Sequence, residues 1–426
     1  MRKRVFLSLF VAAAVLGTAF PALAEETAPA AGATVVEDEA SPTGYTVTFV
    51  LENPGDDVTA VSLRGPFNYL RSDIEPTEEG NEYGPEAFEN GMYPSGIVPA
   101  KLARGEWGGG IEMTKDEESG DYTISFPISS GSFNYGFTLT KADGTTEDIA
   151  DPTNPSPALV NANTNITTGD VTSSIVYGKW DPEKQSESPD FDYVLPSEGD
   201  KGTVTYIEYA GVLGEGQDLG IYVPAGYDPE REEPYKTVYA SHGGGGSEVD
   251  WFAMGHVDNI VDNLGADIIV VTMDNNSLEW DFAKIEENVL DYIIPYMEEN
   301  YNVSKEAKDR AFCGLSMGCM TTFHMFFDHP EAFGYFGGFS GPDMSAVNDN
   351  DVSAPTLYVT VGLCDIASSR IMPNGEGQQI KYEDWVAYLE EHPMDNVILG
   401  GYLPGSHDWF VWSASFKNFI TDICWK

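Results

Sequence analysis

The sequence predicts two domains, an N-terminal antiparallel β-sandwich followed by an α/β domain with a mostly parallel sheet. Residues 42–178 hold short stretches of alternating polar and apolar residues, separated by turns rich in Gly and Pro, with no helical pattern. Residues 202–426 instead alternate strand-like and helix-like segments, which is typical of a parallel sheet covered by helices. A chain of 426 residues is long enough for two separate cores.

In the first half, β-branched and aromatic residues recurring with a period of two predict strands. These strands fall at 44–52, 58–63, 111–115, 122–128, 132–140 and 173–177. Residues 25–41, rich in Ala, Glu, Thr and Pro, are expected to form a disordered tether. The polar and charged residues 179–201 are expected to form the interdomain linker.

In the second half, apolar residues at helical spacing predict a helix over 283–300. Strands are expected at 203–209, 219–223, 236–240, 268–273, 311–313, 356–361 and 397–399.

A Gly-x-Ser-x-Gly match in this half, Gly314 to Gly318, lies between an apolar strand and a helix-like stretch. In this context the match predicts a nucleophile elbow, a tight turn that projects the hydroxyl of Ser316. Side chains at the flanking positions would collide in such a turn, which explains the two glycines. Ser316 is therefore the predicted nucleophile.

A serine nucleophile needs a base, and in this architecture the chain order is Ser, then an acid, then His. His329 and His392 are expected at helix ends, whereas His407 follows the strand at 397–399. A loop at a strand end suits a catalytic base, so His407 is the predicted base.

The acid should follow a strand between the serine and the base. Asp365 comes just after the strand at 356–361 and is the predicted acid, which would orient His407. Asp343 and Asp349 are alternatives in a loop rich in Asp and Asn, where a solvated turn also explains them. The run 348–351 could hold Ca²⁺, although a solvated turn accounts for it as well.

Oxyanion donors are predicted at the backbone N–H of Met317 and in the glycine-rich loop after the strand at 236–240. Gly243 and Gly244 of that loop are the candidate donors. His242 is expected either to fix the loop or to contact substrate. Trp280, in the segment after the strand at 268–273, and Trp409 are predicted to line the acyl or sugar pocket, with a purely structural role as the alternative.

Together these residues resemble the esterase-D-like α/β-hydrolases, and among them carbohydrate esterase family one. The resemblance runs from about residue 202 to 426 and includes the opening strand and turn at 219–227, the loop at 242–246, the helix at 290–301 and the segment at 405–409. It implies an α/β-hydrolase fold with Ser316, Asp365 and His407 as nucleophile, acid and base, and no cofactor. Because the family contains feruloyl and acetylxylan esterases, acyltransferases and siderophore esterases, the acyl group stays open.

The first half resembles the immunoglobulin-like early-set modules that precede glycogen-branching enzymes, through the strand at 133–137 and the loop at 151–155. That resemblance implies a carbohydrate-binding-like module. Phe67, Tyr93 and Trp107 would then either form a platform for sugar rings or pack in the core.

The N-terminus has the pattern of a secretory signal peptide at 1–24, with a basic start, an apolar core at 5–17 and predicted cleavage after Ala24. It predicts secretion. With 69 acidic and 22 basic residues the net charge is −47, which excludes nucleic acid and anionic membrane surfaces as partners and suits neutral polysaccharides.

Four cysteines, Cys313, Cys319, Cys364 and Cys424, allow three disulfide pairings, and their spacing does not suit zinc. No metal site is therefore predicted. The sequence as a whole predicts a secreted serine ester hydrolase that removes ferulic acyl groups from plant cell-wall polysaccharide such as arabinoxylan. Acetylxylan esterase, another acyl esterase or an acyltransferase are alternatives, and a non-catalytic carbohydrate-binding protein is a more distant one.

Overall fold

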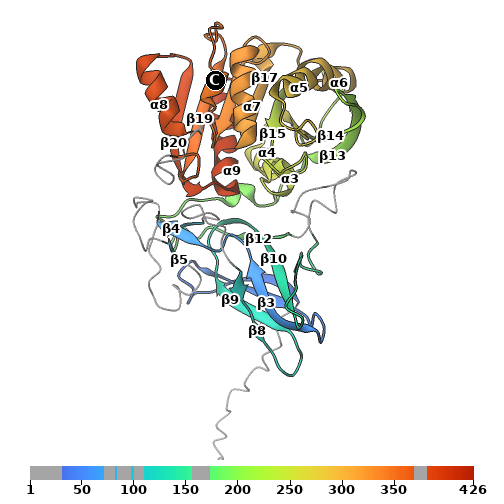
Figure 1. The fold of residues 1–426 in the computed structure, drawn as a ribbon, viewed down its shortest axis with the longest axis vertical. Coiled ribbons are helices and arrows are strands. Elements are labelled where there is room, and N and C mark those ends of the chain that lie inside the picture. The colour runs from blue at the N-terminus through green and yellow to red at the C-terminus, as the bar shows by residue number, and fades with distance from the viewer. Residues whose placement is uncertain (1–30, 72–81, 84–96, 100–109, 156–172, 369–380) are drawn as a thin grey trace, which may run out of the picture.

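A computed structural model describes residues 31–71, 82–83, 97–99, 110–155, 173–368 and 381–426. The expected signal peptide, Tyr93 and Trp107 lie outside these ranges. The chain forms two bodies, a β-rich N-terminal domain and a larger domain in which helices cover a sheet (Figure 1). Within the described ranges, no helix is long and apolar enough to cross a membrane.

The N-terminal domain consists of antiparallel sheets. In order across the sheet, one contains β1 (Gly32–Glu37), β2 (Tyr45–Leu51), β9 (Tyr122–Pro127) and β8 (Thr114–Lys115). Another contains β11 (Thr146–Ile149), β10 (Gly131–Lys141), β3 (Val58–Arg64) and β7 (Ile111–Glu112), and β12 (Ser174–Gly178) also pairs with β10. A small third sheet contains β5 (Glu82–Tyr83), β4 (Tyr69–Arg71) and β6 (Ile97–Pro99). Buried side chains of β2, β3, β9 and β10 belong to one apolar cluster, so the two larger sheets enclose a common core.

Two segments expected to lack packed structure are ordered. The prediction of a disordered tether over 25–41 is wrong for β1, because Val35 pairs with Val47 of β2 and packs against the core. Within the expected linker 179–201, Phe191 is buried and the Gln185 side chain donates to the Thr43 carbonyl (2.8 Å). A buried ring and a buried amide thus anchor this segment to the N-terminal domain. Phe67 packs in the core, with 1% of its surface exposed, and is no sugar platform.

The second domain contains the predicted mostly parallel sheet. Across the described residues its strands run in the order β13 (Thr203–Gly211), β14 (Gly214–Val223), β16 (Ile268–Met273), β15 (Lys236–Ser241), β17 (Arg310–Leu315), β18 (Tyr335–Phe339), β19 (Thr356–Cys364) and β20 (Val397–Ser406). Strand β14 is antiparallel to both β13 and β16, and the pairings from β16 to β20 are parallel. All carboxyl ends of the parallel strands therefore meet at one edge, where ligands bind in such sheets.

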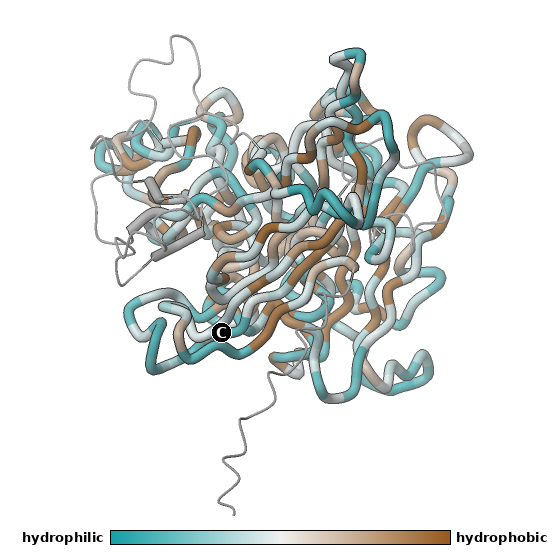
Figure 2. The backbone as a smooth tube through the Cα atoms, turned by 90° about the horizontal axis from the view of Figure 1, so that it is seen from below, coloured by the Kyte–Doolittle hydropathy of each residue, from teal (hydrophilic) through white to brown (hydrophobic). Residues whose placement is uncertain are grey.

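Helices cover both faces of this sheet (Figure 1). One apolar cluster joins it to α3 (Asp250–Ala253), α4 (Val257–Leu264), α9 (Trp409–Asn418) and η7 (Phe419–Ile423). The other joins it to α5 (Phe282–Glu287), η4 (Asn288–Ile293), α6 (Ile294–Asn300), α7 (Met317–Asp328) and α8 (Tyr382–Glu391). The helix expected over 283–300 is present, with a π-helical turn at η4. Figure 2 shows hydrophobic residues gathered along the inner strands and hydrophilic ones in the outer loops.

The two domains share apolar packing. Phe410 of α9 lies in the N-terminal core, with ring centroids 5.3 Å from Phe133 and 5.4 Å from Phe191. Next to it, the Ser132 hydroxyl lies 2.6 Å from Nε2 of the buried His256. The N-terminal domain is therefore packed directly under the start of α9.

Candidate active site

Ser316 sits in a strained turn between β17 and α7. Its backbone lies in the left-handed half of conformational space, at φ 52° and ψ −118°. A Cβ on Gly314 would lie 2.1 Å from the Gly318 carbonyl oxygen, and a Cβ on Gly318 would lie 2.3 Å from the Ser241 carbonyl oxygen. Both glycines of the motif are thus required by backbone contacts, and the turn leaves Ser316 partly exposed.

The structure brings Ser316, His407 and Asp365 together. His407 Nε2 lies 3.0 Å from Ser316 Oγ, and His407 Nδ1 lies 2.7 Å from Asp365 Oδ1. The residues follow β17, β19 and β20, whose carboxyl ends share one edge of the sheet. With Nδ1–H donating to the carboxylate, Nε2 is free to accept the serine proton, which is the arrangement of a serine hydrolase triad.

Asp365 is fully buried and held as a carboxylate. Burial by itself would raise its pKa, but the charge of protonated His407 and hydrogen bonds from His407, Ser340 and the Ala367 N–H outweigh it, so the pKa lies below its ordinary value. The Gly362 N–H also donates to Oδ2 (3.2 Å). An ionised, fixed Asp365 can stabilise the imidazolium that forms when His407 takes a proton.

Ser340 supports the triad and was missed in the sequence. It follows β18, has a positive φ of 61°, and hydrogen-bonds to Asp365. Its hydroxyl also accepts from Trp412 Nε1 (3.0 Å), and the Trp412 ring packs edge-on to His407 with centroids 5.0 Å apart. Ser340 therefore holds Asp365 in place by a hydrogen bond, and Trp412 holds His407 in place by packing against its ring. No local sequence signal marks Ser340, because it follows a short glycine-containing segment without a strand pattern.

The glycine-rich loop after β15 lies against the elbow. A Cβ on Gly243 would lie 3.1 Å from Ser316 Cβ, and one on Gly244 would lie 2.7 Å from Met317 Sδ. Met317 is the first residue of α7, so its N–H is among those left unpaired at a helix start. The predicted oxyanion donors Met317, Gly243 and Gly244 are thus side by side next to Ser316.

His242 fixes this loop. It is fully buried, its Nδ1 lies 2.6 Å from the Gly243 carbonyl oxygen, and its Nε2 accepts from the Asn275 N–H (3.0 Å). Both ring nitrogens are engaged by backbone groups. Of the two roles expected for His242, the structure supports loop fixing rather than contact with substrate.

The two tryptophans proposed as pocket walls differ. Trp280 is partly exposed, packs edge-on to His242 (5.4 Å between centroids) and donates to Asn276 (2.9 Å), which keeps it beside the glycine loop. Trp409 instead packs against Trp251 (5.5 Å) and lines a small cavity at the domain joint with His256. These contacts assign the Trp409 ring to packing.

The alternative residues have structural roles. His329 and His392 end α7 and α8. Asp343 caps η6 (Met344–Ala346) by accepting from the Ser345 N–H (2.8 Å), and Asp349 is exposed. All four cysteines are buried.

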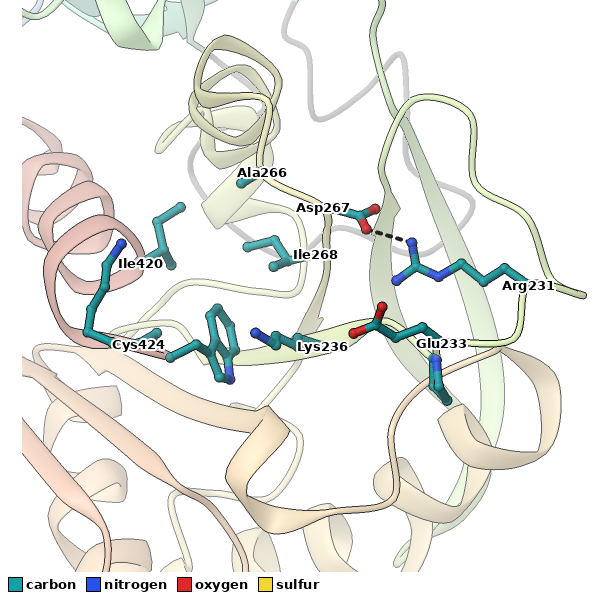
Figure 3. A pocket seen from close by; sticks show the side chains of 11 residues that line it. Arg231, Glu233, Lys236, Ala266, Asp267, Ile268, Ile420 and Cys424 are labelled. Atoms are coloured by element: carbon teal, nitrogen blue, oxygen red, sulfur yellow. Dashed lines mark hydrogen bonds and ion pairs between the residues drawn. The ribbon is translucent and has the colours of Figure 1, made fainter.

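The opposite edge of the sheet carries a pocket of about 350 Å³ (Figure 3). Lys236 and Ile268, the first residues of β15 and β16, line it, so it lies at the amino ends of the parallel strands. Two of its cations have partners within the pocket, since Arg231 pairs with Asp267 (2.5 Å) and Lys236 lies over the Trp425 ring (5.3 Å). It holds none of the triad residues, so the candidate site stays at the other edge.

Comparison with known proteins agrees with this geometry. Residues 211–421 match the family described as putative esterase. These residues belong to the esterase family. We therefore call the α/β domain the esterase domain. It is 32% identical over 168 residues to an endo-1,4-beta-xylanase/feruloyl esterase of Xylanibacter ruminicola, a match covering 36% of this chain and 23% of that protein.

Two further similarities extend the comparison. Endo-1,4-beta-xylanase Y of Acetivibrio thermocellus is 28% identical over 156 residues, covering 33% of this chain and 14% of that protein. The chain thus spans less than a quarter of the length of these two relatives. The enterobactin esterase of Shigella flexneri aligns with both domains, with a TM-score of 0.52 and 13% identity over 87% of this chain and 91% of that chain. The arrangement of a β-rich domain before an α/β domain is therefore a known fold.

Proposed function

We propose that this protein is a secreted esterase that removes ferulic or related hydroxycinnamic acyl groups from plant cell-wall polysaccharide such as arabinoxylan. The observation that carries the proposal is the hydrogen-bonded Ser316–His407–Asp365 arrangement, in a domain similar to a xylanase/feruloyl esterase. The net charge of −47 fits a neutral polysaccharide better than an acidic one.

In this reaction the Ser316 hydroxyl attacks the ester carbonyl carbon while Nε2 of His407 accepts its proton. Asp365 holds the Nδ1–H and stabilises the resulting imidazolium. The carbonyl oxygen becomes an oxyanion, which accepts hydrogen bonds from the N–H of Met317 and from an N–H of the Gly243–Gly244 segment.

Collapse of the tetrahedral intermediate breaks the bond to the sugar oxygen, and His407 donates its proton to that leaving oxygen. The acyl group stays on Ser316 as an ester. Water then attacks this ester, again with His407 as base, and releases the carboxylic acid and free Ser316. These steps need no cofactor. Trp280, beside the glycine loop, is the proposed contact for the aromatic acyl group.

The N-terminal domain is proposed to be an immunoglobulin-like module, from its two antiparallel sheets around one core. Binding of polysaccharide by this module remains a prediction. Sedimentation of the inactive Ser316→Ala protein with insoluble xylan tests this prediction. A protein that binds the polymer without hydrolysing it should be found in the pellet.

The test of function compares wild type, Ser316→Ala and a control variant on feruloylated arabinoxylan and acetylated xylan. The control is Ser353→Ala, which changes an exposed serine. We expect ferulate release by wild type and control, and a loss of roughly 10⁴-fold or more in Ser316→Ala. Acetate release alone would identify the alternative, an acetylxylan esterase. If neither product is released but a fluorophosphonate labels Ser316, the serine mechanism stands and the proposed substrate is refuted.

A further inference from the structure

A second group of chemically active side chains lies between helices α5 and α7, outside the triad. One potential metal-ligand atom from each of Glu286, His324 and Asp328 lies within 4.8 Å of the other two. His324 and Asp328 are one helical turn apart on α7, the helix that begins at the elbow, and Glu286 reaches them from α5. The proposed ester hydrolysis uses none of these three residues.

Glu286 is a buried carboxylate with one unused oxygen. The residue exposes only 9% of its surface, and its Oε1 is buried without a hydrogen-bond partner. Its other oxygen, Oε2, faces His329 Nε2 at 3.5 Å. Leaving a buried carboxylate oxygen unpaired is costly, so Oε1 calls for a ligand that is positively charged.

His324 and Asp328 each pair one polar atom with a residue outside the cluster and direct the other atom into the cluster. Asp328 Oδ1 accepts from Asn348 Nδ2 (2.8 Å), which leaves Oδ2 directed at the cluster. His324 Nε2 faces Asp343 Oδ2 (3.4 Å), which leaves Nδ1 on the cluster side, 3.7 Å from Asp328 Oδ2. Metal-binding histidines commonly pair their second nitrogen with a carboxylate in this way.

The spacing and charge of the cluster suit an ion. Tetrahedral zinc with bonds of ~2.0–2.2 Å separates neighbouring ligand atoms by roughly 3.3–3.6 Å, close to the 3.7 Å between His324 Nδ1 and Asp328 Oδ2. Three carboxylates, Glu286, Asp328 and Asp343, face only two imidazoles.

We propose that Glu286, His324 and Asp328 bind one divalent transition-metal ion of the zinc type, with water completing its coordination. The mixed nitrogen and oxygen donors favour zinc over Ca²⁺ or Mg²⁺, which prefer oxygen alone. Because its ligands come from two helices, the ion would cross-link α5 to α7 and so stabilise the helix that supports Ser316. His329, Asp343 and Asn348 would be its outer partners.

The test uses the untagged full chain, stripped with EDTA and freed of chelator. Equilibrium dialysis against buffered Zn²⁺, with bound metal measured by mass spectrometry, is run on wild type, Glu286→Gln and His324→Gln. The matched control is His392→Gln, because this histidine ends α8 and stacks on Tyr388 instead of facing carboxylates. Circular dichroism confirms folding, and the nearly isosteric Glu286→Gln carries the test if His324→Gln fails to fold.

We expect one Zn²⁺ per folded chain in wild type and in His392→Gln, and a loss of affinity above ~100-fold in Glu286→Gln and His324→Gln. Removing the outer partner with Asp343→Asn should weaken binding by roughly 10–100-fold. Zinc should also raise the melting temperature of wild type but not of Glu286→Gln. No bound zinc, equal binding by wild type and Glu286→Gln, or a preference for Ca²⁺ would each overturn the proposal, whatever the esterase assay shows.

Discussion

The packing between the two domains beneath His407, the proposed base, can be tested by removing one ring with Phe410→Ala. Phe410 is 5% exposed and packs edge-on to Phe133 and Phe191 of the N-terminal side. It lies three positions after His407. Between them Asp408 accepts hydrogen bonds from Ser406 Oγ (2.6 Å) and from the Phe410 N–H (3.1 Å), so the loop that carries His407 is tied to the buried ring.

The expected effect has two parts. Truncating a buried Phe to Ala costs about 3–5 kcal/mol through lost apolar contact and the cavity that remains. Relaxation into that cavity should also move the start of α9, and with it His407, which must stay near 3.0 Å from Ser316. Because a misplacement of ~1 Å can cost ~10²-fold in rate, we expect kcat/KM to fall by roughly 10- to 100-fold.

The matched control is Phe126→Ala. Phe126 has the same 5% exposure and belongs to the same core, but it packs on Phe49 and Phe67 of the N-terminal domain. Denaturant unfolding and kcat/KM on a soluble aryl ester are measured for both variants. Both should lose stability, and only Phe410→Ala should lose activity. Equal kcat/KM for Phe410→Ala and Phe126→Ala, at temperatures where both are folded, would refute the coupling of joint and site.

Three further results are expected. Asp365→Asn should lower kcat by about 10⁴-fold with little change in KM, because His407 is no longer held in the tautomer whose Nε2 accepts the serine proton. Steady-state kinetics measure both constants. Gly318→Ala should lower kcat at least ~10²-fold, because the added Cβ would displace the Ser241 carbonyl and with it the glycine-rich loop after β15. The control Gly199→Ala, at a position with space for a Cβ, should leave kcat unchanged. Burial lowers the pKa of His256 from 6.5 to about 4. As the pH falls from 6.5 towards 4, the unfolded chain is therefore protonated at this histidine before the folded chain is, and the free energy of unfolding decreases. Between pH 7 and 5, wild type should lose ~2 kcal/mol more than His256→Gln in urea titrations, and equal losses would contradict it.

Features set by short-range sterics could be predicted from the sequence. The elbow needs two glycines within five residues, and the glycine loop needs small residues directly after a strand, so both leave a local pattern. Asp365 and His407 were found because each follows an apolar run that forms a strand. The predicted helix over 283–300 and most strand positions rest on the same periodicity.

Features set by distant packing could not be predicted. Strand β18, read YFGGF, was missed because its two glycines disfavour a strand by composition. They are small for a packing reason, since a Cβ on Gly338 would lie 3.0 Å from Cys319 Sγ of α7. Missing β18 also hid Ser340, whose partners Asp365 and Trp412 are far away in sequence. The His256–Ser132 contact likewise joins residues 124 positions apart.

The meeting of acid and base depends on such a detail, the register between β19 and β20. At the start of this pairing Leu357 lies opposite Val397, and at its end Cys364 lies opposite Ser406, with register shifts after Val359 and after Gly362. The shifts fall near Gly401 and Gly405, which have φ of 75° and 130° and so accommodate extra residues on β20. Without these shifts, the initial register would place Asp365 opposite Gly405, which lies two residues before His407. At ~3.3 Å per residue, His407 would then be displaced from Asp365 by about 6–7 Å along the strand. Apolar patterning alone therefore locates both proposed catalytic residues, but the two glycine-containing bulges bring them into contact.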